Sequence, residues 1–104
     1  MELPLTESIR PDERILFLGL PDAAVVAAVA RAASAGAVVV MAQGEAVYEG
    51  RRAFRDLDNV MVTPGSPDEL PWRDGFFTRV IDMVRDWPDA AKVRREVERV
   101  TAHG

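Results

Sequence analysis

The sequence predicts an α/β fold built on a mainly parallel β-sheet. Short apolar runs typical of buried strands alternate along the chain with stretches that have amphipathic helix spacing, in the order β-α-β-α-β-β-α. Alternation of this kind implies right-handed crossovers between parallel strands. The chain has 104 residues, 48% of them hydrophobic, and contains no internal repeat or linker. We therefore expect a single domain over residues 1–104, in which residues 1–13 form an N-terminal arm.

The first strand is expected over residues 14–19, a continuous apolar run that ends in a glycine. Pro21 and Asp22 then predict a helix start, because proline suits the first turn and a carboxylate suits the positive end of the helix dipole. This helix is expected over residues 22–35, with Gly36 as its C-cap. Its apolar stripe consists of Val25, Val26, Val29, Ala32 and Ala33.

Residues 37–42 predict a second buried strand, which Gln43 and Gly44 bring to an end. A second helix is expected over residues 45–57, where apolar positions recur at three- and four-residue spacings. Those positions are Val47, Gly50, Phe54 and Leu57. Residues 59–63 predict the third strand.

Residues 66–75 predict a loop, because prolines, a glycine and several acids interrupt any periodic pattern there. A fourth strand is expected over residues 76–84. Pro88 and Asp89 predict the start of the last helix. Its apolar stripe consists of Ala90, Val93, Val97 and Val100.

The composition excludes several kinds of chemistry. The chain has no cysteine, which rules out a disulfide framework, a thiolate metal site and a cysteine nucleophile. Its one histidine, His103, is the penultimate residue, so neither histidine catalysis nor a metal site is expected. A net charge of −4 argues against a nucleic-acid partner. Apolar runs such as residues 23–30 are too short to cross a membrane, and the acidic start does not resemble a secretory signal, so we expect a cytoplasmic location.

Candidate ligand-binding residues are those that follow the strands, because ligands of open α/β sheets bind beyond the carboxyl ends of the strands. A nucleotide-binding turn after the first strand would carry several glycines, and here only Gly19 is present. Asp22 in the same turn would repel an anion. Gln43, after the second strand, offers hydrogen bonds to a hydroxyl group. No phosphate-binding loop and no catalytic residue are predicted. The complete candidate set for cofactor binding is Gly19, Asp22, Gln43, Gly65, Ser66 and Asp82.

Three other features each have two interpretations. Asp68 and Glu69, together with Asp74, have two interpretations. They are either paired carboxylates that serve in acid/base work or bind a divalent cation, or exposed residues of a solvated loop. Trp72 either stacks on a ligand or covers the sheet edge. Basic clusters on the helices alternate with acids, which favours a face of salt bridges over a phosphate site. These clusters are Arg51, Arg52 and Arg55, and Arg94, Arg95 and Arg99.

The order of these pieces resembles class I S-adenosylmethionine-dependent methyltransferases, of the methyltransferase type 11-like group, over residues 14–104. Residues 15–19 stand where that family carries its glycine-rich first motif, and residues 38–42 resemble its second strand. Residues 59–77, with Leu70-Pro71-Trp72 and Phe77, resemble its third strand, its "LPF" loop and the start of its fourth strand. The last helix resembles the one before the family's "GG" turn. The resemblance implies a three-layer, Rossmann-like half-domain with strand order 3-2-1-4.

The departures from this family fall where it binds its cofactor. Acids of the family's pattern are replaced in the first strand, after the second strand, at the adenine position and in the "FD" pair, and later glycines of the first loop are lost. The four acid positions hold, in the order just given, Phe17, Ala42, Ser66 and Thr78. The two glycine positions hold Pro21 and Ala23. We therefore expect no cofactor, or S-adenosylmethionine only if the chain is an enzyme after all.

The chain stops where the family begins its fifth strand, which leaves the fourth strand as an open edge. Polar Thr78 and Arg79 fit an edge that faces water or a partner. Our main hypothesis is a non-catalytic binding or assembly module that self-associates through the fourth strand or the last helix, or binds a second protein chain. The alternative is an S-adenosylmethionine-dependent methyltransferase, or a subunit of one, whose site another chain completes. A third possibility is a site for another small metabolite in the same crevice.

Overall fold

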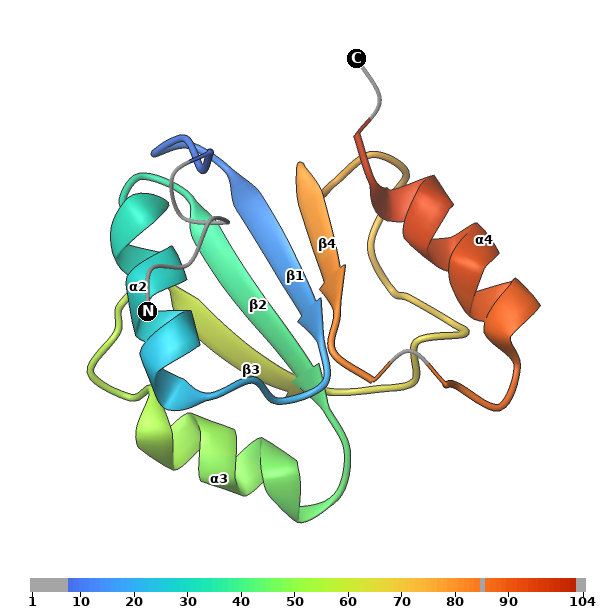
Figure 1. Cartoon of the computed structure of the whole chain (residues 1–104), viewed down its shortest axis with the longest axis horizontal. Helices are drawn as coiled ribbons and strands as arrows, with labels where there is room; N and C mark the ends of the chain where they lie inside the picture. Colours follow the sequence, from blue (N-terminus) through green and yellow to red (C-terminus); the bar gives the residue numbers. More distant parts are fainter. Residues whose placement is uncertain (1–7, 85, 103–104) are drawn as a thin grey trace.

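The computed structural model describes residues 8–84 and 86–102. The elements, labelled as in Figure 1, are β1 (Arg14–Leu18), α2 (Ala23–Ala32), β2 (Ala37–Ala42), α3 (Glu45–Ala53), β3 (Val60–Pro64), β4 (Arg79–Asp82) and α4 (Ala90–Val100).

The four strands form one parallel sheet in the order β3-β2-β1-β4, which confirms the predicted topology. Phe17 of β1 pairs with Val40 of β2 on one side and with Ile81 of β4 on the other. β1 is therefore central, and its apolar residues from Ile15 to Leu18 are fully buried. A continuous apolar run is what a strand covered on both faces requires.

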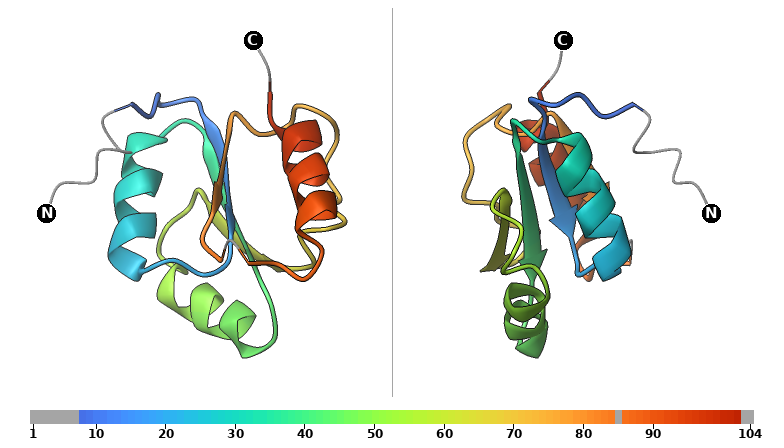
Figure 2. Two further views of the ribbon diagram at one scale, coloured as in Figure 1. Left: turned by 45° about the vertical axis from the view of Figure 1, so that its right-hand side comes forward. Right: turned by 90° about the vertical axis from the view of Figure 1, so that its left-hand side faces the viewer.

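Helices cover both faces of the sheet, which gives the predicted three layers: α2 and α3 lie on one face and α4 on the other (Figure 2). Successive residues of β1 alternate between the two cores, with Ile15 and Phe17 in the first and Leu16 and Leu18 in the second. Trp72 packs edge-on against Phe77 in the second core, with ring centroids 5.0 Å apart. Of the two interpretations of Trp72, the structure supports the one in which it covers the sheet.

The first two helices end earlier than predicted. α2 stops at Ala32, and Asn59 donates its side-chain amide to the carbonyls of Ala30 at 2.9 Å and Ala33 at 3.0 Å. This distant side chain satisfies the free carbonyls of the helix end, so Gly36 is not the C-cap. Gly36 instead passes close to the main chain of Glu13, where an added Cβ would lie 1.9 Å from the carbonyl oxygen. α3 likewise ends at Ala53, short of the predicted residue 57.

The third and fourth strands also differ from the prediction. β3 runs over Val60–Pro64, so the whole strand lies one residue later than the expected 59–63. β4 covers only Arg79–Asp82 of the predicted 76–84. It starts late because Phe77 hydrogen-bonds to the end of α4 instead. The N–H of Phe77 donates to Val100 at 2.8 Å, and its carbonyl accepts from Ala102 at 2.7 Å. In α4, Val93 and Val100 are buried as predicted, whereas Ala90 is exposed.

The polar residues at the start of β4 have partners within the chain. Arg79 forms a salt bridge with the buried Glu13, Nε to Oε1 at 3.2 Å, and the Thr78 hydroxyl donates to the same oxygen at 3.2 Å. The polarity of Thr78 and Arg79 is thus explained by Glu13, and it is not evidence for a partner at this edge. Within residues 8–84 and 86–102, no helix has the length and apolar character needed to span a bilayer.

Candidate functional site

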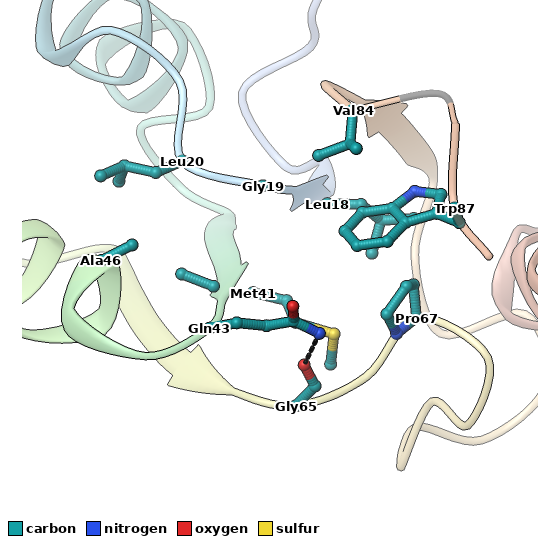
Figure 3. Close-up of a pocket in the computed structure, with 11 residues that line it drawn as sticks. Leu18, Gly19, Leu20, Met41, Gln43, Ala46, Gly65, Pro67, Val84 and Trp87 are labelled. Carbon is teal, nitrogen blue, oxygen red and sulfur yellow. Dashed lines mark hydrogen bonds between the residues drawn. The ribbon is translucent and has the colours of Figure 1, made fainter.

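A pocket of about 290 Å³ lies at the carboxyl ends of β1 and β2, where the fold predicts a ligand site (Figure 3). The loop after β3 and the segment after β4 close its sides. Among the described residues no charged side chain lines it. The lining residues are Leu18, Gly19, Leu20, Met41, Ala42, Gln43, Ala46, Gly65, Pro67, Val84 and Trp87.

Gly19 lets the chain turn tightly at the end of β1. Its φ of +102° is unfavourable for a residue with a side chain, and an added Cβ would lie 3.0 Å from Cγ2 of Val84. Its N–H donates to the carbonyl of Met41 at 2.9 Å. This N–H is therefore used within the sheet, and Gly19 shapes the pocket wall.

Gln43 and Gly65 meet at the pocket mouth, as their places after β2 and β3 predict. Nε2 of Gln43 donates to the carbonyl oxygen of Gly65 at 3.2 Å. Because that carbonyl can only accept, the amide nitrogen must face it, and Oε1 of Gln43 points into the pocket (Figure 3). An added Cβ on Gly65 would lie 2.6 Å from Cε of Met41, so this glycine leaves room for the methionine side chain.

Asp82 acts on the pocket through Trp87. Oδ1 of Asp82 accepts hydrogen bonds from the main-chain N–H of Val84 and from Nε1 of Trp87, both at 3.0 Å. Asp82 itself does not line the pocket, whereas Trp87 does. Sequence reasoning missed Trp87. The available signal was its place just before the helix start at Pro88.

Ser66 and Asp22 lie outside the pocket. The Ser66 hydroxyl donates to Oδ1 of Asp68 at 2.6 Å and lines an adjacent hollow of about 360 Å³, which shares Gln43 and Trp87 with the pocket and has acids on its rim. Asp22 precedes α2, is exposed and makes no capping hydrogen bond through its side chain. Of the six predicted residues, Gly19, Gln43 and Gly65 line the pocket, and Asp82 contacts the lining residue Trp87 from outside it.

The acidic loop residues do not converge on a metal site. Asp68 binds Ser66, whereas Asp74 forms a salt bridge with Arg99 at 2.9 Å. Across residues 8–84 and 86–102, no three acidic or histidine side chains are arranged to hold a metal ion. These observations favour the second interpretation, in which the acids belong to a solvated loop.

Arg99 fastens the loop before β4 onto α4. Its guanidinium donates to the carbonyls of Leu70 at 2.7 Å and Trp72 at 2.8 Å, to Asp74, and to Glu96 at 2.8 Å. The hydrogen bonds from Arg99 and from the Leu70 N–H lower the pKa of Glu96 below its ordinary value. Arg99 therefore belongs to a salt-bridge network, as predicted for the basic clusters.

The strand order, the layers and the crevice at the strand ends define the methyltransferase-like Rossmann fold. No protein-family model and no curated protein matches the sequence. Solved structures do match. An S-adenosylmethionine-dependent methyltransferase from Aquifex aeolicus superposes with a TM-score of 0.79 at 17% identity, covering 90% of this chain and 53% of that one.

Two further structures extend this likeness. The [4+2]-cyclase SpnF has a TM-score of 0.80 at 20% identity, over 96% of this chain and 41% of its own. A chain in a complex that contains the Haloferax volcanii Trm112 methyltransferase activator has a TM-score of 0.76 at 17% identity, over 93% and 44%. At these identities the likeness shows the fold alone. The chain spans about half the length of the structures that it resembles.

The pocket does not fit S-adenosylmethionine in the family's usual manner. That cofactor carries a ribose diol, a carboxylate and two positive centres, which all need polar partners. Ala42 stands where the resemblance places the ribose-binding acid. Among the described lining side chains only Gln43 and Trp87 have hydrogen-bonding groups, and Nε1 of Trp87 already donates to Asp82. Oδ1 of the nearby Asp82 already accepts from two donors. The residues present therefore suit a less polar ligand.

Proposed function

We propose that this chain is a non-catalytic, cytoplasmic methyltransferase-like module that assembles with a second copy of itself along the outer edge of β4. The observation that carries the proposal is a groove of about 380 Å³ that lies along α4 and reaches Asp82, the last residue of β4. Its lining residues are Asp82, Trp87, Ala90, Val93, Arg94, Val97 and Glu98. The apolar lining of the pocket supports the non-catalytic part, because its described residues offer no acid or base to a reaction.

The outer edge of β4 has the hydrogen-bonding groups that a second strand requires. The N–H of Thr78 donates to Arg14 of β1 at 2.8 Å. Since alternate residues of a parallel strand face the same neighbour, Arg79 and Ile81 direct their N–H and C=O groups away from β1. A two-fold axis beside Val80 would pair β4 antiparallel with its copy, with Arg79 of each copy opposite Ile81 of the other.

The charges on the groove rim match the same symmetry. Arg94 and Glu98 lie one helical turn apart on α4, and both line the groove. A two-fold axis would place Arg94 of each copy near Glu98 of the other, and the apolar floor between them would be covered. A short edge strand can also be a means of avoiding association, so the groove supports the proposal more strongly than the edge does.

A pair of neighbouring alanines provides the test. Ala90 and Ala91 are both exposed at the start of α4, but only Ala90 lines the groove. Ala90→Arg should weaken self-association at least about tenfold by filling the groove, whereas the control Ala91→Arg should leave it unchanged. Sedimentation equilibrium measures both. An equal effect of the two substitutions, or none, would contradict this interface.

The second candidate is an S-adenosylmethionine-dependent methyltransferase, or a subunit of one, whose site another chain completes. It is favoured by the place of the pocket at the strand ends. It is also favoured by the fold shared with the Aquifex methyltransferase and with a chain of the Haloferax complex that contains a methyltransferase activator. Calorimetry with S-adenosylmethionine and S-adenosylhomocysteine separates the two candidates. We expect no heat of binding. A dissociation constant of about 1 μM or lower for either compound would overturn the non-catalytic proposal.

A further inference from the structure

We infer that the pocket at the ends of β1 and β2 binds an uncharged, planar and mostly apolar small molecule that carries one N–H or O–H donor. This ligand class goes beyond the proposed assembly and differs from S-adenosylmethionine. The pocket is a separate hollow from the groove along α4, although Trp87 contributes to both. Gln43 lines the pocket but not the groove, so a signal from Gln43 reports binding in the pocket apart from association at the groove.

The lining residues that the structure describes are uncharged, which favours an uncharged ligand. Leu18 and Met41 are buried and supply an apolar interior, and the exposed Val84 adds an apolar side to the pocket. A charged group placed there would lose water without gaining a counter-ion, which is strongly unfavourable. The volume of about 290 Å³ is at the small end of the range for ligand pockets and suits a one- or two-ring molecule.

Trp87 gives the pocket a rigid aromatic wall. Its indole is fixed by the hydrogen bond from Nε1 to Asp82 at 3.0 Å, and the same carboxylate oxygen holds the main chain of Val84 at 3.0 Å. Figure 3 shows Trp87 and Val84 across the hollow from Gln43 and Gly65. Because these groups are already oriented, a planar ligand can pack on the indole at little ordering cost.

Gln43 supplies the polar end of the site. Its amide nitrogen is held by Gly65, so Oε1 is presented to the pocket as an acceptor in a fixed direction. Gln43 is exposed and thus marks the mouth, whereas Leu18 and Met41 are buried and lie deeper. A ligand that donates one hydrogen bond at the mouth and buries an apolar ring inside satisfies both parts.

Indole and its derivatives test each element of this inference by ¹⁵N NMR titration. Indole should shift the side-chain amide of Gln43 and the indole N–H of Trp87, and leave the signal of Trp72, in the second core, unchanged. 1-Methylindole lacks the donor and should bind about threefold to tenfold more weakly. Indole-3-acetate and tryptamine, which are charged, should bind more weakly than indole.

A substitution at the mouth shows whether Gln43 is the acceptor. Gln43→Leu should remove the preference for indole over 1-methylindole, because neither molecule then finds an acceptor. Ser66→Ala, in the adjacent hollow, is the control and should keep the preference. The inference is overturned if about 10 mM indole shifts no pocket resonance, if 1-methylindole binds as tightly as indole to the unsubstituted chain, or if a charged derivative binds best.

Discussion

The indole N–H of Trp87 donates a hydrogen bond to Oδ1 of Asp82 at 3.0 Å. Asp82 is the last residue of β4, and Trp87 is a wall of the pocket, so this contact joins the end of the strand to the candidate site. Asp82 was expected to touch a ligand directly. Its position behind Trp87 instead makes it a residue that orients the pocket.

Removal of this carboxylate should loosen the pocket wall. Asp82→Ala deprives Trp87 and Val84 of their common acceptor, and we expect a loss of about 1 to 3 kcal/mol in unfolding free energy. Hydrogen exchange of the Trp87 indole N–H should become faster, which NMR can follow. Asp86→Ala, at an exposed position nearby, serves as the control. Unchanged exchange in the Asp82 variant would show that the contact does not hold the ring.

The guanidinium of Arg99 should not be replaceable by an amine. It donates to two loop carbonyls and to Glu96 and Asp74, and lysine lacks this forked set of donors. Arg99→Lys should lower Tm by about 10 °C. Arg95→Lys, at an exposed position on the same helix, should stay within about 0.5 kcal/mol of the wild type. Calorimetric melting of both variants decides; similar Tm values would argue against the network.

Glu13 should make stability depend on pH in the acid range. Burial raises its pKa, but hydrogen bonds from Arg79, Arg10 and Thr78, and the charge of Arg79, together hold that pKa below the ordinary 4.5. Because the folded-state pKa is the lower one, ionised Glu13 stabilises the fold above about pH 4.5, and this contribution is lost as the pH falls through the folded-state value.

Glu13→Gln measures that contribution. The variant should be about 1 to 3 kcal/mol less stable than the wild type near pH 7, and the difference should shrink below pH 4.5. Urea unfolding at a series of pH values follows both proteins. A difference that stays constant down to about pH 3 would mean that ionised Glu13 is not the source.

Gly36 should tolerate no side chain. An added Cβ would lie 1.9 Å from the carbonyl oxygen of Glu13, and main chain cannot move aside as a flexible side chain can. Gly36→Ala should therefore cost about 3 kcal/mol or more. Ser34→Ala, at an exposed position two residues earlier, should cost little. Denaturant midpoints compare the two, and a stable Gly36→Ala variant would contradict the close approach.

Strand positions were predictable because burial is encoded locally. Ile15 to Leu18 and Ala37 to Ala42 are continuous apolar runs, and both form strands where expected. Helix ends were less predictable. The carbonyls at the end of α2 are satisfied by Asn59, a contact over 26 residues or more that no local pattern contains. The late start of β4 depends in the same way on Phe77, which lies before the strand and hydrogen-bonds to the end of α4.

The candidate site was predictable in its backbone positions and less so in its side chains. Gly19, Gln43 and Gly65 follow from the rule that ligands bind at the ends of strands. The two tryptophans could not be distinguished in this way. Trp72, for which the sequence allows stacking on a ligand, packs against the second core. Trp87 lines the pocket and donates a hydrogen bond to Asp82.

The mass of the chain in solution tests the central proposal most directly. Multi-angle light scattering should give twice the 11.4 kDa of one chain at about 100 μM, with a fall toward the single-chain mass on dilution. A mass of one chain at the highest concentration that stays in solution would contradict assembly along β4.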